Sequence, residues 1–428
     1  MSRIHRSARI LRRFLQIPLR LPDRFDRSRM WSPRSVLLWL LVLTSPDRRT
    51  AYRRTLATLE PLGLRLLGWT RRPSPASICV ARRKLSIAMC RDALHAVVSA
   101  CERVLGPQRH LHGDRRFIAI DGTRLVTRRS ADTARRLARY PRPNGEKVHN
   151  PQGLVVAAVD VFRRLPLDWV LVGKGKSERT ALIGLLETLR LGRGDVVIMD
   201  RGFASRQRFG ALLERGVDLV ARMSTSEVNG WTEVAAFLAS GSKNAVIQLN
   251  VGERNDPVLV RARLVERDAR RGRPRTGTKA ERMVILTTLT EEDGFTRKEI
   301  VDIYAARWGI ESLFKELKSF MAVEPFHSTT VHGCEQEIAA SLLWMALAAY
   351  LQGEAERTLE GRKVYRTDCL RAATDLVTLF LAGLPIEDAM RRDIAALRDY
   401  SYAPRSGRHY PRECKMPFGR TIQRGGVK

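Results

Sequence analysis

Tyr304-Ala-Ala-Arg-Trp-Gly-Ile-Glu-Ser-Leu-Phe-Lys-Glu-Leu-Lys318 is the stretch on which our interpretation of this sequence depends. We expect it to lie on a long helix from about Arg297 to Met321. At about 100° per residue, one helix face about 80° wide carries five polar side chains: Tyr304, Arg307, Glu311, Lys315 and Lys318. A neighbouring face is apolar and wide enough for a core contact. Glu311 and Lys315 could simply form a solvated i,i+4 ion pair, but the whole array also suits a phosphate-binding face around one carboxylate.

Two aspartates follow apolar segments that we expect to be strands. Asp121 comes after Phe117–Ile120 and precedes Gly122-Thr123, and Asp200 comes after Asp195–Met199 and precedes Arg201-Gly202. Sites in open α/β sheets gather at the carboxyl ends of strands. For either aspartate alone, capping of the following loop is an equally good explanation.

Asp121, Asp200 and Glu311 together could hold two Mg²⁺ ions. Hard cations prefer carboxylate oxygens. Two ions about 3.5–4 Å apart can activate an attacking oxygen and stabilise a leaving one. The three acids therefore favour phosphodiester chemistry, in which no nucleophilic Cys or Ser/His pair is needed.

The charge of the chain points to a polyanionic partner. There are 76 Lys and Arg against 45 Asp and Glu, a net charge of +31 over 428 residues. Residues 1–113 hold 23 basic and 6 acidic side chains, a net +17, and residues 401–428 add about +6. A nucleic acid backbone is the usual partner of such an excess. Arg-rich codon usage explains part of the Arg content but not the shortage of acids.

The basic N-terminal region is expected to be helical. Ser74-Pro75 is typical of a helix start, and the helix that follows carries Arg82, Arg83 and Lys84. A short basic helix after another helix and a turn could be a recognition helix that contacts DNA. A solvated basic face is the alternative.

The order of the expected elements predicts an α/β class with a mixed sheet. We expect a helical DNA-binding domain over residues 1–113 and a catalytic domain over 114–350, with a β-rich insertion at about 224–296. Residues 351–428 are expected to form C-terminal helices and a basic tail. The six cysteines include no CxxC pair, and the longest apolar run, Val36–Leu43, is too short to span a bilayer. We therefore expect neither a zinc site nor a membrane segment, nor any organic cofactor.

A family resemblance follows from these motifs. Tyr304-x2-Arg307-x3-Glu311-x6-Lys318 resembles, without a gap, the motif of IS4-type insertion-sequence transposases of the DDE superfamily. Asp121-Gly-Thr, Asp200-Arg-Gly-Phe and the run Lys174–Leu189 are also similar to this family. The resemblance covers about residues 116–350, including both strand-end aspartates.

The resemblance implies an RNase H-like catalytic core with a β-strand insertion before the last acid. Asp121, Asp200 and Glu311 would be the catalytic, metal-binding triad, with two Mg²⁺ ions that Mn²⁺ can replace. Tyr304, Arg307 and Lys318, supported by Lys315, would hold the DNA end. The enzyme would cut double-stranded DNA at the element ends and join the 3′-OH ends to target DNA, as a homodimer. The resemblance also implies a bacterial protein that lies in the cytoplasm and is associated with the nucleoid because it binds DNA.

Two features limit what the resemblance implies. Some relatives carry a Trp on the strand before the long helix, where it stacks on a flipped base; the corresponding residue here is Met283, and the only Trp of the insertion is Trp231. Glu178 begins a helix near the expected site, and capping explains it adequately. The alternatives to a transposase are an inactive, transposase-derived DNA-binding protein and an RNase H-like nuclease without strand transfer.

Overall fold

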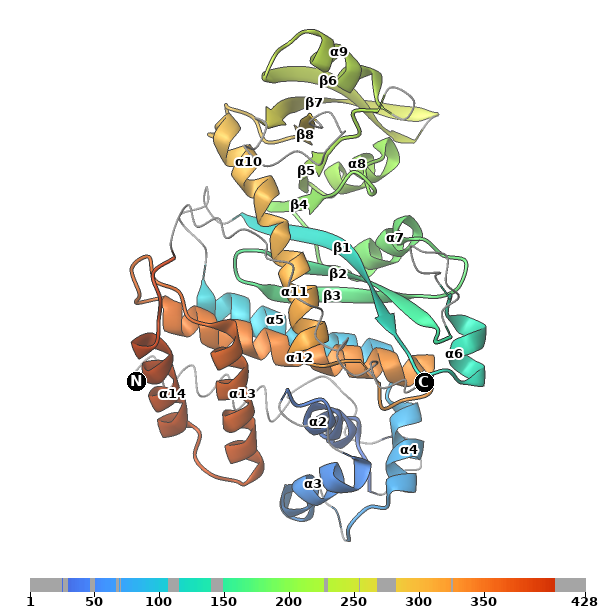
Figure 1. The fold of residues 1–428 in the computed structure, drawn as a ribbon, viewed down its shortest axis with the longest axis vertical. Coiled ribbons are helices and arrows are strands. Elements are labelled where there is room, and N and C mark those ends of the chain that lie inside the picture. Colours follow the sequence, from blue (N-terminus) through green and yellow to red (C-terminus); the bar gives the residue numbers. More distant parts are fainter. Residues whose placement is uncertain are drawn as a thin grey trace, which may run out of the picture.

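The computed structural model describes most of the chain: residues 25, 30–46, 51–66, 69, 71–106, 115–139, 149–226, 230–253, 255–267, 282–324 and 326–404. One mixed sheet of eight strands runs through the described part in the order β3-β2-β1-β4-β5-β8-β7-β6 (Figure 1). Its strands are β1 (Arg116–Val126), β2 (Gln152–Asp160), β3 (Leu165–Val172), β4 (Asp195–Met199), β5 (Asp218–Arg222), β6 (Asn244–Glu253), β7 (Asp256–Arg267) and β8 (Met283–Thr287).

The strand directions confirm the predicted mixed α/β fold. β1 pairs with β2, and β2 with β3, in antiparallel fashion, whereas β4 and β5 are parallel to β1. Three antiparallel strands followed by alternating helices and parallel strands are consistent with an RNase H-like core. β4 is buried at all five positions, as expected for a central parallel strand covered on both faces.

The predicted insertion extends this sheet instead of standing apart from it. β8 pairs antiparallel with β5, and β7 and β6 follow in antiparallel order. The segment also contains a helix, α9 (Thr232–Ala239), beside its three strands. The basic loop around Arg270–Gly277 lies outside the described residues. Backbone hydrogen bonds between β8 and β5 thus join the insertion to the rest of the sheet.

Helices from both ends of the chain pack together under β3. The N-terminal region forms α2 (Pro33–Leu43), α3 (Tyr52–Leu66), α4 (Pro75–Lys84) and α5 (Ile87–Leu105). The C-terminal region forms α12 (Val331–Glu356), α13 (Arg366–Leu381) and α14 (Glu387–Asp399). Among the remaining helices are α6 (Ala131–Arg136), α7 (Glu178–Thr188) and α8 (Arg206–Leu213). The predicted basic tail lies outside the described residues from 405 onward.

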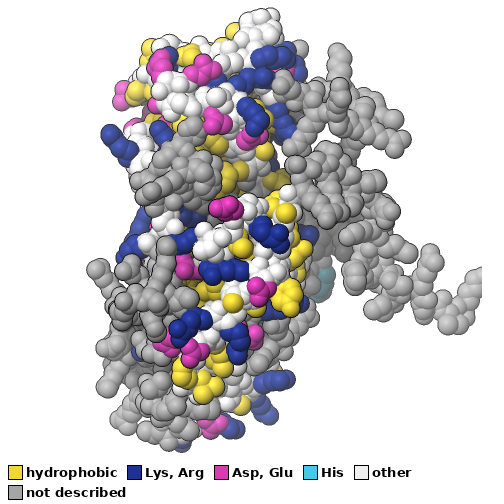
Figure 2. All heavy atoms as spheres, turned by 90° about the vertical axis from the view of Figure 1, so that its left-hand side faces the viewer, with side chains coloured by type: hydrophobic (Ala, Val, Ile, Leu, Met, Phe, Trp, Pro, Cys, Tyr) yellow, Lys and Arg dark blue, Asp and Glu magenta, His cyan; other side chains and the backbone are white. Residues whose placement is uncertain are grey.

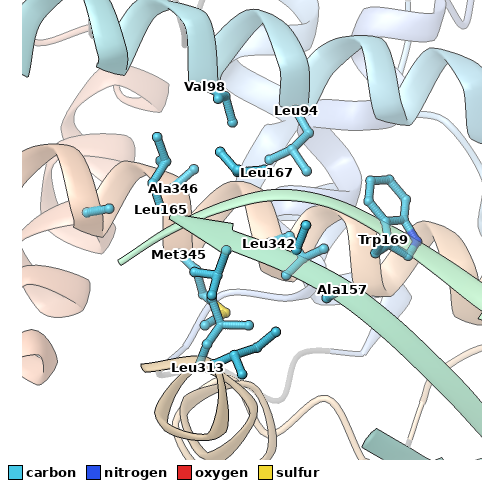
Figure 3. Close-up of a cluster of buried hydrophobic side chains, with 14 of the residues drawn as sticks. Leu94, Val98, Ala157, Leu165, Leu167, Trp169, Leu313, Leu342, Met345 and Ala346 are labelled. Atoms are coloured by element: carbon cyan, nitrogen blue, oxygen red, sulfur yellow. The ribbon is translucent and has the colours of Figure 1, made fainter. Parts of the chain in front are cut away.

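One part of the buried apolar core joins α5, β3 and α12. Leu94 and Val98 of α5 face Leu167 of β3, and α12 adds a buried set on the same cluster: Leu342, Met345 and Ala346 (Figure 3). α12 is long and apolar enough to cross a membrane by composition, but 94% of its most apolar window is buried inside the molecule. A domain boundary at residue 350 would cut this helix, which contacts the N-terminal helices, β3 and α13.

The predicted long helix consists of two helices that meet at Arg307. α10 (Arg297–Ala306) is started by a capping box between Thr296 and Glu299. α11 (Trp308–Ser319) continues in nearly the same direction, and Figure 1 shows it crossing over β1 and β2. Arg307 keeps helical dihedral angles (φ −48°, ψ −32°), and its amide bonds to the Tyr304 carbonyl in an i→i−3 turn. The prediction of one continuous helix is therefore wrong at Arg307, where the two helices meet.

Candidate active site

Asp121 and Asp200 lie side by side because of the strand register. In the parallel pair of β1 and β4, Ile120 is paired with Met199, so each aspartate is the next residue along its strand. Their local settings match: Asp121 Oδ1 accepts a hydrogen bond from the Gly122 amide, and Asp200 Oδ1 accepts one from the Arg201 amide, both at 2.8 Å. The two aspartates therefore lie next to each other where the pairing of β1 with β4 ends.

Asp121 does not end its strand, in contrast to the prediction. β1 continues to Val126 and stays paired with β2 along that length. Its pairing with β4 stops at Ile120, because the chain turns away after Met199. Beyond Asp121 the strand is held on one side only, and most of its residues are partly or fully exposed.

Arg307 links the first and third acids. Its Nη1 atom lies 2.9 Å from Asp121 Oδ2, and its Nη2 atom lies 3.0 Å from Glu311 Oε1. A single guanidinium thus bridges β1 and α11. Arg307 holds these contacts from the turn between α10 and α11, where the chain presents it toward the sheet.

Asp200 is contacted by two other elements. The buried Tyr304 of α10 donates its hydroxyl hydrogen to Asp200 Oδ1 at 3.2 Å. Arg222, the last residue of β5, places Nη1 4.0 Å from the same oxygen. Sequence reasoning missed Arg222, although a strand-end position next to β4 was a usable signal.

The acids of the site lie close enough to affect one another's pKa, and the positive charge of Arg307 partly compensates for them. Burial raises the pKa of Asp121, and the charge of Asp200 raises it further, while the Gly122 amide and Arg307 oppose the shift. Burial and the neighbouring Asp200 raise the pKa of Tyr304 to about 12, so its hydroxyl stays a donor at neutral pH. Like charges disfavour joint ionisation, and Arg307 lowers that cost here.

The donor set fits a divalent cation by its chemistry. Asp121, Asp200 and Glu311 supply carboxylate oxygens, the preferred ligands of Mg²⁺. In the described part of the chain, no three Asp, Glu, His or Cys side chains form one metal-binding group. The guanidinium of Arg307 lies between two of the acids and provides positive charge there.

Comparison with known families shows the family to which the chain belongs. The family model of the transposase DDE domain matches residues 112–347, more than half of the chain. The chain is a member of the DDE transposase family. That range includes the three acids, Tyr304 and Arg307. The IS4-type assignment within the family remains a prediction.

Comparison with individual proteins adds less. No curated protein matches the chain. Among solved structures, a cryo-EM structure of a piggyBac transposase synaptic complex with hairpin DNA matches over 94% of this chain and 83% of the other chain. The sequence identity is 13% and the TM-score is 0.41.

The last two residues of the predicted polar helix face of this DDE transposase point to solvent. Lys315 and Lys318 are exposed on α11, and neither forms an ion pair with another described residue. The structure therefore divides the residues of this polar helix face into two groups. Tyr304, Arg307 and Glu311 meet the aspartates, whereas the two lysines are available on the surface beside them.

Glu178, which we interpreted from the sequence as a capping residue, is a fourth acid close to the site. It is the first residue of α7 and is exposed. Partial desolvation together with the charges of Asp121 and Asp200 raises its pKa, against the opposing charge of Arg124. An acid in the first turn of a helix is common, so the sequence alone gave no reason to look further.

The candidates for base stacking differ in their exposure. Trp231 packs against Phe209, with ring centroids 5.5 Å apart, and lies under the Arg206 guanidinium at 4.5 Å. Met283 is half-buried at the start of β8, where its sulfur lies 3.8 Å from Arg267 Nη1. Trp308, which we did not consider from the sequence, is 59% exposed three residues before Glu311. Of these three side chains, Trp308 presents the most open aromatic surface.

The predicted recognition helix requires a correction at Arg82. α4 begins at Pro75 with Ser74 as its cap, as predicted. Arg83 and Lys84 are exposed, but Arg82 is only 6% exposed. Its guanidinium donates to Glu337 Oε1 at 2.8 Å, to Gln336 Oε1 at 2.8 Å and to the Gly333 carbonyl at 2.6 Å. Arg82 thus ties α4 to α12 and does not face a DNA partner.

The basic surface is widespread. Figure 2 shows Lys and Arg side chains along the whole length of one face, with acidic and hydrophobic side chains between them. Many described arginines are paired with acids, for example Arg206 with Glu233 and Arg261 with Glu292. The net positive charge is therefore not confined to one described patch.

Proposed function

We propose that this DDE transposase binds the terminal inverted repeats of an insertion sequence, cuts phosphodiester bonds at the element ends and joins the 3′-OH ends to target DNA. The observation that carries the proposal is that Arg307 contacts both Asp121 and Glu311, while the nearby Tyr304 contacts Asp200, so that acids from three separate segments are tied to two neighbouring side chains. An ordinary solvated salt-bridge face would not place its arginine between two acids of different elements.

Asp121, Asp200 and Glu311 are proposed to hold two Mg²⁺ ions, with Mn²⁺ as a substitute. Bound divalent ions would supply Lewis-acid activation of the attacking oxygen and charge stabilisation of the leaving one. The chain's own part is to present three carboxylates from rigid strands and a helix, so that little reorganisation is needed.

The remaining residues of the site are proposed to hold DNA. Arg307 neutralises Asp121 and Glu311 here, and its planar guanidinium is also suited to grip a phosphate with two hydrogen bonds. Lys315 and Lys318 are exposed on the same helix and would add point charges along the DNA backbone. Tyr304 is proposed to orient Asp200 through its hydroxyl and to contact the DNA end.

The N-terminal helices are proposed to recognise the element end, with Arg83 and Lys84 of α4 as contacts. Two copies of the chain would pair two DNA ends. Both proposals rest on the family and on the net charge of +17 over residues 1–113. We propose a location in the bacterial cytoplasm at the nucleoid, since the substrate is chromosomal or plasmid DNA.

A plasmid assay with supplied ends tests the proposed function. The full chain is incubated with Mg²⁺ or Mn²⁺, a supercoiled target and DNA carrying the inverted repeats that flank the gene. We expect nicking at the repeat ends and covalent joining of the 3′-OH ends to the target. Binding without nicking would favour an inactive DNA-binding protein, and cleavage without joining would favour a nuclease.

Arg307→Ala is expected to weaken binding of a pre-cut element end about tenfold or more, because a charge-assisted hydrogen bond contributes about 1.5–3 kcal/mol. The slope of log affinity against log salt concentration should fall by about one, the value for one lost phosphate contact. Fluorescence anisotropy with a labelled duplex at several salt concentrations measures both quantities.

Two further variants make the Arg307 result specific. Arg307→Lys keeps the charge but loses the two-pronged geometry, so we expect an intermediate loss. Arg371→Ala removes an exposed arginine from α13 whose ion-pair partner among the described residues is Asp368, at 3.3 Å, and it should leave end binding unchanged. If Arg307→Ala bound the DNA end with unchanged affinity and unchanged salt dependence, Arg307 would contact only Asp121 and Glu311 and not the DNA.

A further inference from the structure

Glu178 occupies the space that a side chain at position 122 would need. A Cβ atom built on Gly122 would come within 2.8 Å of Glu178 Oε1 and 3.0 Å of its Cδ atom. Gly122 lies within β1 at no unusual dihedral angle, so backbone conformation does not require a glycine there. A glycine inside a strand often marks a close approach by another group, and here that group is a carboxylate.

A second contact fixes the start of α7 beside the other aspartate. Arg179, the residue after Glu178, donates from Nε to the carbonyl oxygen of Gly202 at 2.9 Å. Gly202 lies in the turn directly after Asp200. The first turn of α7 is therefore held against both aspartate-bearing segments, β1 at Gly122 and the turn at Gly202.

The carboxylate of Glu178 has no hydrogen bond or ion pair with any residue in the described ranges. Asp121, Asp200 and Glu311 each have one, to Arg307 or to Tyr304. Stabilisation of the helix start explains an acid at the first position of α7. It does not explain why this carboxylate lies over Gly122, or why residue 122 lacks a side chain.

We propose that Glu178 is a fourth carboxylate of the divalent-ion site, beside Asp121, Asp200 and Glu311. This inference rests on the proposed metal-dependent function. Successive residues of a strand project to opposite faces, so Glu178 meets β1 on the face away from the Asp121 side chain. Because β4 ends at Met199, no strand covers that side of Asp121 and Gly122, and carboxylates from both faces can reach the same ion there.

The proposal predicts that Glu178→Gln weakens metal binding without unfolding the protein. Mn²⁺ binding to the full chain is measured from the free-ion signal in electron paramagnetic resonance. We expect the dissociation constant to rise about 10- to 100-fold, the range seen when a supporting group of a metal site is lost. Glu187→Gln, which removes an exposed acid from the same helix, should bind Mn²⁺ like the unchanged protein.

Asp121→Asn separates failure of this inference from failure of the proposed function. If Asp121→Asn loses Mn²⁺ binding while Glu178→Gln keeps it, Glu178 serves only the helix start and the inference is overturned. If neither variant changes Mn²⁺ binding, or the unchanged protein binds none, the metal site itself is wrong and the inference falls with it.

Gly122→Ala provides a second route to the same group. The added methyl should push the flexible Glu178 carboxylate aside and weaken Mn²⁺ binding to a similar extent. In a Glu178→Ala background the same substitution should cause no further loss, because there is no carboxylate left to displace. Equal, additive losses in both backgrounds would mean that Gly122 acts on Asp121 instead, which would contradict the proposal.

Discussion

DNA cleavage is expected to fall by at least about 1,000-fold when Glu311 is replaced by Gln, which corresponds to about 4 kcal/mol of activation free energy. Gln has nearly the same shape and keeps an oxygen that can accept the hydrogen bond from Arg307. It lacks the negative charge that a divalent ion requires. Single-turnover cleavage of a labelled element end measures the loss.

Binding of the element end should be largely intact in Glu311→Gln. The substitution removes an acid and leaves Arg307, Lys315 and Lys318 in place. Glu360→Gln, which removes an exposed acid outside the site, is the matched control for a change in net charge. Joint loss of binding and cleavage would instead assign Glu311 a structural role, and normal cleavage would remove it from the catalytic set.

Arg82→Ala is expected to lower the free energy of unfolding by about 3–5 kcal/mol, the usual result when one partner of a buried ion pair is removed. Glu337 is 2% exposed, and its carboxylate also accepts hydrogen bonds from the amides of His327 and Ser328. Without Arg82, this buried charge loses the guanidinium that lies 2.8 Å from its Oε1 atom. Urea unfolding followed by circular dichroism measures the shift.

The neighbouring arginine gives the matched comparison. Arg83→Ala changes an exposed residue one position along α4, so we expect a stability change within about 0.5 kcal/mol. Its effect should be on DNA binding instead. If Arg82→Ala left stability unchanged and reduced DNA binding as Arg83→Ala does, Arg82 would be a surface contact, as the sequence suggested.

Much of the sheet could be predicted from the sequence because short, mostly buried strands form continuous apolar runs with a strong local signal. Asp195–Met199 and Leu165–Val172 were predicted with the bounds that the structure has. β1 was predicted too short for a physical reason. After Asp121 the strand pairs with β2 alone and its residues are partly exposed, so the apolar pattern that marks a strand fades.

Contacts between distant segments could not be predicted. The partners of Arg82 on α12 lie more than 250 residues away, and nothing local distinguishes this arginine from Arg83. The role of Gly122 also depends on where α7 begins relative to β1. The family motif predicted that the three acids act together, which remains a prediction, whereas nothing in the sequence predicted the position of Arg307 between Asp121 and Glu311.

The pairing of β8 with β5 places the insertion next to the strand that ends beside Asp200. β5 ends in Arg222 beside Asp200, and α10, which carries Tyr304, contacts β5, β7 and β8. Removing the segment would leave β5 as an open sheet edge, a template for aggregation, and would leave α10 without its support. We therefore expect that deletion of the insertion would disrupt the fold. Changes of sequence should be tolerated in the loops of the insertion, but changes in the length of its strands should not.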